Sequence, residues 1–212
     1  MKGLTSYHLK LIAALSMLLD HIGEVFYLET DWLRMVGRLS FPLFVWLLVQ
    51  GEAHTRNAWR YGGRLLLLGL VSQPIYQYVF HTSEPNILFQ LLVGLTCLRV
   101  TRRKPRLALV IWPLGVVLTE LLHISYGGYG IVLILLTRYF RQTWPWWSAW
   151  LGFHVLWLWL MGLFQLWALP VPILFGLATG QRGLRARGFY IFYPGHLALL
   201  GLIRVALQAP GI

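Results

Sequence analysis

Apolar residues recur along almost the whole chain, in runs separated by short polar breaks, from about residue 9 to residue 207. Several runs approach the ~20 residues that an α-helix needs to cross a bilayer. The pattern predicts nine helical crossings, near 9–28, 33–51, 62–80, 86–100, 107–123, 127–141, 146–164, 166–180 and 189–207. Pro170 and Pro172 make the eighth segment equally typical of a broken or re-entrant helix, so eight crossings are the main alternative and eight to ten the range.

The composition predicts the same class of protein. Of the 212 residues, 58% are hydrophobic, which exceeds what a soluble domain of this size needs. We therefore expect an all-α, polytopic integral membrane bundle. No Gly/Ser-rich linker, low-complexity tract or internal repeat interrupts it, which predicts one domain over residues 1–212.

The net charge of +11 comes from basic clusters that alternate with segments lacking them. By the positive-inside rule these clusters, and with them the N-terminus, are cytoplasmic, and the charge does not indicate nucleic-acid binding. The clusters are Lys2 and Lys10; Arg56, Arg60 and Arg64; Arg99, Arg102, Arg103, Lys104 and Arg106; Arg138 and Arg141; and Arg182, Arg185 and Arg187.

The first predicted helix carries a polar face where a membrane span should be apolar. At 100° per residue, Ser16, Asp20, Glu24 and Tyr27 share one direction, and His21 lies at the edge of that stripe. Ionisable groups within a span face the bundle interior or a water-filled cavity. Asp20 and His21 therefore indicate a functional site in the outer half of this helix.

The second helix contains "GRLSFPLF" at residues 37–44 and runs in the opposite direction, which brings Arg38 to the depth of Asp20. A guanidinium there needs a carboxylate, and Asp20 or Glu24 is the natural partner. Pro42 predicts a kink. The pair is also compatible with a purely structural role. His21, beside Asp20 and near Arg38, is typical of a general base whose imidazole Asp20 or Glu24 orients.

Three later segments have the composition of cavity linings. "EPNILF" places Asn86 at the start of the fourth helix, and "SYGGYG" places Tyr126 at the start of the sixth. "FYPGHLALLG" places Tyr193 and His196 in the cytoplasmic half of the last helix. Helix caps, turns and a kink explain these segments equally well. Because the seven histidines lie at different predicted depths, we expect no metal site.

The chain resembles the TraX family of membrane proteins, which is implicated in acetylating conjugative pilin. The resemblance rests on the order and spacing of Lys10, Asp20-His21, "GRLSFPLF", "NILF", "SYG" and "FYPGHLALLG". That family is similar to the transmembrane acyltransferase superfamily, which includes the acyltransferase-3 proteins and the lysosomal heparan acetyltransferase. Acyltransferase-3 proteins carry a basic residue and a histidine eleven positions later. The resemblance transfers the catalytic role to His21, with Lys10 in place of the usual arginine.

The resemblance implies a multi-pass protein of the bacterial inner membrane, with acetyl-CoA as donor on the cytoplasmic side. The acceptor, a pilin N-terminus or another envelope amine or hydroxyl, would approach from outside. Lys10, Arg56, Arg60 and Arg64, together with the group from Arg102 to Arg106, are the expected ligands of the coenzyme A phosphates, although topology and anionic lipids use such charges too. The expected contacts of the thioester and the acceptor are Arg38, Glu24, Asn86, Tyr126, Tyr193 and His196.

Two other functions fit the same residues. A proton-coupled transporter would use Asp20, His21, Glu24 and Arg38 as a relay, although the chain lacks the repeated halves that many transporters show. A non-catalytic assembly factor for a pilin-like membrane protein would need no coenzyme A. Binding of acetyl-CoA distinguishes that factor from an acyltransferase.

Overall fold

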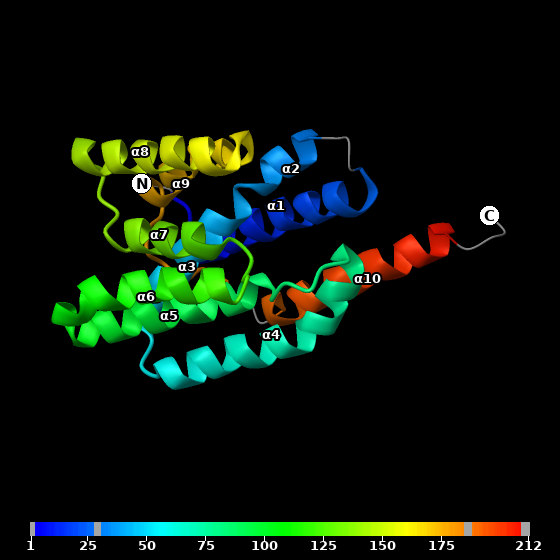
Figure 1. Ribbon diagram of the computed structural model, residues 1–212, viewed down its shortest axis with the longest axis horizontal. Coiled ribbons are helices and arrows are strands. Elements are labelled where there is room, and N and C mark those ends of the chain that lie inside the picture. The colour runs from blue at the N-terminus through cyan, green and yellow to red at the C-terminus, as the bar shows by residue number, and fades with distance from the viewer. Residues whose placement is uncertain (1–2, 28–30, 185–187, 209–212) are drawn as a thin grey trace.

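A computed structural model describes residues 3–27, 31–184 and 188–208, and these are almost entirely helical (Figure 1). Within them the only extended pairing is a single parallel bridge between Leu4 and Ala178. The basic residues Lys2, Arg185 and Arg187 lie outside the described residues. The helices are α1 Ser6–Phe26, α2 Asp31–Gly37, α3 Ser40–His54, α4 Ala58–Phe80, α5 Ile87–Arg103, η1 Pro105–Leu107, α6 Ala108–Leu121, α7 Gly127–Arg138, α8 Trp144–Met161, η2 Leu163–Ala168, α9 Val171–Gly176 and α10 Phe189–Gln208.

Each of the nine predicted segments coincides with a helix or with a pair of short helices. The second segment is divided into α2 and α3, and the eighth into η2 and α9. The predicted break of the eighth segment at its prolines is confirmed. In the second segment the break falls at Arg38 and Leu39, ahead of Pro42, which occupies the first turn of α3, where a proline costs no helical hydrogen bond.

The all-α prediction is confirmed, but the number of membrane crossings is not. Among the described residues, two stretches, Asp31–His54 and Phe189–Leu207, are long and apolar enough to cross a bilayer, and two such helices are weak support for a membrane protein.

Large apolar side chains are exposed on the surface along α4, α6, α8 and α10. Examples are Leu67, Leu109, Trp159 and Ile191, which are 63%, 88%, 88% and 73% exposed. Soluble monomers rarely expose large contiguous apolar patches.

The described helices pack around three hydrophobic clusters, and α1 contributes to the two smaller ones. The larger hydrophobic core joins α3, α5, α7 and α8 and includes Phe41, Leu98 and Trp150. In one of the smaller clusters Met17 of α1 packs with Tyr193 and Leu197 of α10, which runs along α4 (Figure 1). Helix α1 is therefore packed against α2, α3 and α10.

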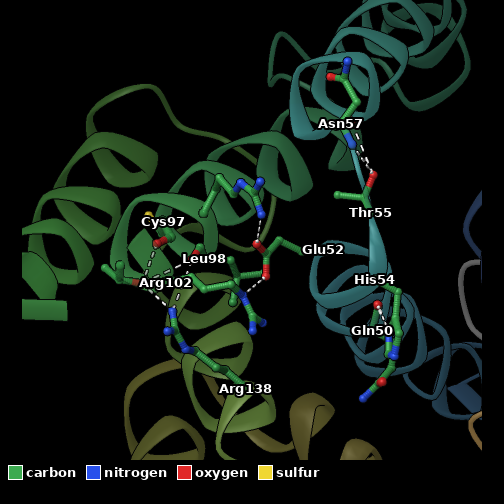
Figure 2. A network of polar contacts seen from close by, with 11 residues as sticks. Gln50, Glu52, His54, Thr55, Asn57, Cys97, Leu98, Arg102 and Arg138 are labelled. Atoms are coloured by element: carbon green, nitrogen blue, oxygen red, sulfur yellow. Dashed lines mark hydrogen bonds and ion pairs between the residues drawn. The ribbon is translucent and has the colours of Figure 1, made fainter. Parts of the chain in front are cut away.

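A buried ion-pair network ties the ends of α3 and α5 together (Figure 2). The Glu52 side chain is fully buried and accepts hydrogen bonds from Arg99 Nη1 at 3.3 Å and Arg102 Nε at 2.7 Å. Beside it, Arg138 of α7 donates to Thr101 and to the Leu98 carbonyl. The basic clusters of α5 and α7 therefore gather at one end of the bundle, next to the end of α3.

Candidate functional site

Four charged side chains join α1 to α2 and to the turn that follows α2. Arg38 Nη2 donates to Asp20 Oδ1 at 3.2 Å, and Arg34 Nε lies 3.8 Å from the same oxygen. Arg34 also forms an ion pair with Glu24. Of the two carboxylates expected as partners of Arg38, Asp20 thus forms an ion pair with it. Sequence reasoning missed Arg34, although its position one turn before Arg38 on the same helix face pointed to it.

Gly37 allows this pairing because it brings α2 against Asp20. A Cβ atom on Gly37 would lie 2.5 Å from Asp20 Oδ1 and 2.6 Å from its Cγ. Gly37 is buried and ends α2. The glycine before Arg38 therefore sets the distance between the backbone of α2 and the carboxylate that Arg38 binds.

His21 has a different hydrogen-bond partner from the one expected. Its Nδ1 lies 2.7 Å from Nε2 of His196 on α10, and the two rings are inclined by only 10°. Within the described residues the imidazole forms no hydrogen bond with Asp20 or Glu24, whose carboxylates pair with Arg34 and Arg38 instead. Because this contact places the two rings at one depth, the expected positions of His21 in the outer half and His196 in the cytoplasmic half cannot both hold.

A cavity of about 1370 Å³ runs from Asp20 and His21 to the end of the bundle that carries Lys10. Asp20, His21 and Tyr126 line one part, and Lys10 and Arg64 line another. Apolar side chains form most of the wall between the two parts, among them Phe44, Leu48, Leu88 and Leu91. The fold therefore connects a basic mouth to the histidine through one continuous space.

The basic mouth contains a residue that the sequence did not single out as a ligand, Arg182. The N–H groups of Ser6 and Tyr7, at the start of α1, donate to the carbonyls of Gln181 and Arg182 at 2.8 and 3.1 Å. This connection holds the segment before α10 beside α1, and Arg182 consequently lines the cavity together with Lys10.

Arg64 is placed at the mouth by two aromatic rings. Its guanidinium carbon lies 5.9 Å from the ring centre of Tyr61 and 5.6 Å from that of Tyr190, within the range of cation–π attraction. Both tyrosines line the cavity. Arg60 is in α4 with Arg64, and Arg56 lies just before that helix. Both face a second, shallower hollow of about 500 Å³ that Arg64 also borders.

Tyr126 lies beside the charged cluster. Its hydroxyl is 3.5 Å from Arg38 Nη1, and its ring stacks on Phe41 with 4.0 Å between the centres. The residue adopts a left-handed backbone with φ of 70°, which turns the chain into α7. The structure thus brings Tyr126, Arg38 and Asp20 together.

Asn86 has a structural role at the start of a helix, whereas Tyr193 lines the cavity. Asn86 is fully buried and caps α5: it accepts from Leu88 N–H at 3.0 Å and donates to the Gly69 carbonyl and to Gln73 Oε1, each at 2.9 Å. It does not belong to the lining of the cavity. Tyr193 does line it. No group of three metal-ligating side chains occurs within the described ranges.

The sequence model of the TraX protein family matches residues 6–204. The chain belongs to the TraX family. This family is associated with pilin acetylation. A TraX relative from Escherichia coli is 38% identical over 90 residues, which make up 41% of this chain and 36% of that protein. The relative from E. coli strain K12 is 36% identical over a stretch of the same extent.

A further relative matches almost end to end. It is named "probable fimbrial assembly protein FimC, serogroup H1", comes from Dichelobacter nodosus, and is 29% identical over 96% of this chain and 97% of its own length. No solved structure matches.

Proposed function

We propose that this TraX-family chain is a membrane-embedded acetyltransferase, which moves an acetyl group from acetyl-CoA to an amine or hydroxyl of pilin or another envelope acceptor. The observation that carries the proposal is the single cavity that joins a basic mouth to His21. An acyl-CoA ligand has this same division, with phosphates at one end and a reactive thioester at the other.

Lys10, Arg64 and Arg182 are the groups that bind the coenzyme A phosphates in this proposal, because all three line the mouth of the cavity. Lys10 and His21 are eleven residues apart on α1, which is about 16 Å along a helix axis. An extended pantetheine arm covers such a distance along the apolar wall. Arg56 and Arg60, which face the other hollow, are less suited to this role than the sequence analysis expected.

The chemistry needs one base and one group that stabilises the developing oxyanion. His21 takes the proton from the acceptor amine or hydroxyl as its nitrogen or oxygen bonds to the thioester carbonyl carbon. The C–S bond then breaks, coenzyme A leaves as the thiolate, and the proton passes from His21 to that sulfur. Tyr126, which lines the cavity and contacts Arg38, donates to the carbonyl oxygen as it becomes negative.

Two features support the membrane part of the proposal. Large apolar side chains point outward along four helices, which suits contact with lipid chains. The basic side chains of α5, α7 and the cavity mouth belong to clusters that the positive-inside rule assigns to the cytoplasm. Acetyl-CoA is made in the cytosol, so a mouth on this side gives it direct entry.

The first test is binding and slow hydrolysis of acetyl-CoA by the detergent-purified protein. We expect wild type and His21→Ala to bind acetyl-CoA equally by calorimetry, and hydrolysis to free coenzyme A to fall by about 100-fold or more in the variant. His154→Ala is the control, because His154 is buried but lies outside the cavity lining. Absence of binding by wild type, or full hydrolysis by His21→Ala, contradicts the proposal.

A non-catalytic role in pilus assembly is the second candidate, and the end-to-end similarity to the fimbrial assembly protein favours it. Such a factor would bind a pilin-like partner without a donor. Thermal unfolding separates the two functions: the Tm of an acetyltransferase rises with the logarithm of the acetyl-CoA concentration above Kd, whereas an assembly factor keeps its Tm.

A further inference from the structure

His196 stands behind His21, away from the cavity. Its side chain is almost completely buried, at 6% exposure, and it is not among the residues that line the cavity, whereas His21 is. We propose that His196 is a positioning residue that fixes the tautomer of His21, so that the bare nitrogen of His21 is Nε2. The inference rests on the proposed function only for its catalytic consequence.

The tautomer follows from a chain of hydrogen bonds that has one fixed end. His196 Nδ1 lies 2.7 Å from the backbone carbonyl oxygen of Phe192. A carbonyl only accepts, so Nδ1 of His196 carries a hydrogen, and in the neutral ring Nε2 is then an acceptor. That Nε2 is the atom 2.7 Å from His21 Nδ1. His21 must therefore donate from Nδ1, which leaves the lone pair on its Nε2.

The same hydrogen bond from histidine Nδ1 to a backbone carbonyl occurs at two other histidines in the described helices. His54 and His154 also place Nδ1 at 2.8 and 2.9 Å from the carbonyl four residues earlier. A helical histidine held in this way presents Nε2 as an acceptor beyond its own helix. For His154 the partner is the Tyr129 hydroxyl at 3.3 Å, whereas for His196 it is a second imidazole.

The geometry between the two rings suits this bond. The lone pair of an imidazole nitrogen lies in the plane of its ring, and the planes of His21 and His196 differ by only 10°. The alternative orienting groups of the sequence analysis, Asp20 and Glu24, are held by Arg34 and Arg38. The orienting partner is therefore a neutral ring rather than a carboxylate.

The arrangement has a defined consequence for proton transfer. When Nε2 of His21 takes the acceptor's proton, the imidazolium keeps its Nδ1–H bond to His196, and a hydrogen bond from a charged donor is stronger than one from a neutral donor. His196 therefore stabilises the charged form of His21 without giving up or gaining a proton. The proton on Nε2 later goes to the leaving thiolate.

The test reads the tautomer directly, by ¹⁵N NMR of the full-length protein labelled at histidine. We expect His21, assigned by the signal missing in His21→Ala, to show a protonated Nδ1 and a bare Nε2. His196→Leu removes the acceptor at similar volume, and the Nδ1-protonated population of His21 should fall. His196→Gln places an amide oxygen near the position of Nε2 and should restore it. Thermal unfolding of each variant confirms that it is folded.

Kinetics provide the second readout. For His196→Leu, kcat for acetyl-CoA hydrolysis should drop by about 10-fold to 100-fold with KM unchanged, and His196→Gln should recover most of that loss. A wild-type His21 protonated on Nε2 overturns the inference, as does a Gln variant that is no better than Leu in both readouts. If wild type hydrolyses no acetyl-CoA, the proposed function fails, but the NMR result still decides the tautomer.

Discussion

Gly37→Ala tests whether the close approach of α2 to Asp20 sets the geometry of the site. The added Cβ would lie 2.6 Å from Asp20 Cγ, whereas ordinary contacts begin at 3.4 Å, so the carboxylate must move by almost 1 Å. The Asp20 Cβ is overlapped as well, so a rotamer change alone cannot relieve the contact. A shift of that size takes Asp20 Oδ1 out of hydrogen-bond reach of Arg38, now 3.2 Å away.

Two measurements follow from this shift. Overpacking of this kind costs about 1–3 kcal/mol, which lowers Tm by roughly 2–10 °C in a chain of this length. Misplacement by ~1 Å at the site should reduce acetyl-CoA hydrolysis by about 10-fold to 100-fold. The assays are thermal unfolding in detergent and release of free coenzyme A.

Gly152→Ala is the matched control, because Gly152 is inside α8 and a Cβ there meets nothing within 4 Å. Alanine favours the helix, so its Tm should rise slightly, by the equivalent of about 1 kcal/mol or less, with hydrolysis unchanged. If Gly37→Ala behaves like Gly152→Ala in both assays, the reasoning about α2 and Asp20 is refuted.

Three further predictions concern other parts of the molecule. Glu52→Gln leaves two arginines facing an uncharged buried amide and should lower the free energy of unfolding by about 2–4 kcal/mol, whereas Glu84→Gln, at an exposed site, should change nothing measurable in thermal unfolding. Tyr126→Phe should slow acetyl-CoA hydrolysis by about 10-fold to 100-fold at unchanged Kd, and equal rates would exclude its role at the oxyanion. Arg64→Gln should weaken acetyl-CoA binding by about 10-fold in calorimetry, and the exposed Arg106→Gln should not.

Several features could be predicted from neighbouring residues alone. The helices follow from apolar runs whose length and periodicity are local properties, and all nine predicted segments coincide with helices or helix pairs. The pairing of Asp20 with Arg38 was accessible because the two residues are 18 positions apart on consecutive segments. A short connection makes such segments antiparallel neighbours, and a charge in an apolar helix needs a partner.

Other features were misjudged where a residue had two local explanations. Asn86 was expected at the cavity, but its side chain is fully used in capping α5 and contacting α4. Asparagine is common both at caps and at sites, so the residue type does not separate the two. Likewise Arg56 and Arg60 resemble Arg64 in sequence, and only the packing of the helices decides which arginine lines the cavity.

The sequence by itself determined the helical class, the polar face of α1, the need of Arg38 for a carboxylate on α1 and the positions of the basic clusters, because each depends on local composition or on adjacent segments. Only the tertiary structure decided that His21 meets His196, 175 residues away, and that Lys10, Arg64 and Arg182 share one cavity with it. These contacts depend on where α10 packs against α1 and α4. That position is determined by the packing of many apolar side chains at once, which no single motif records.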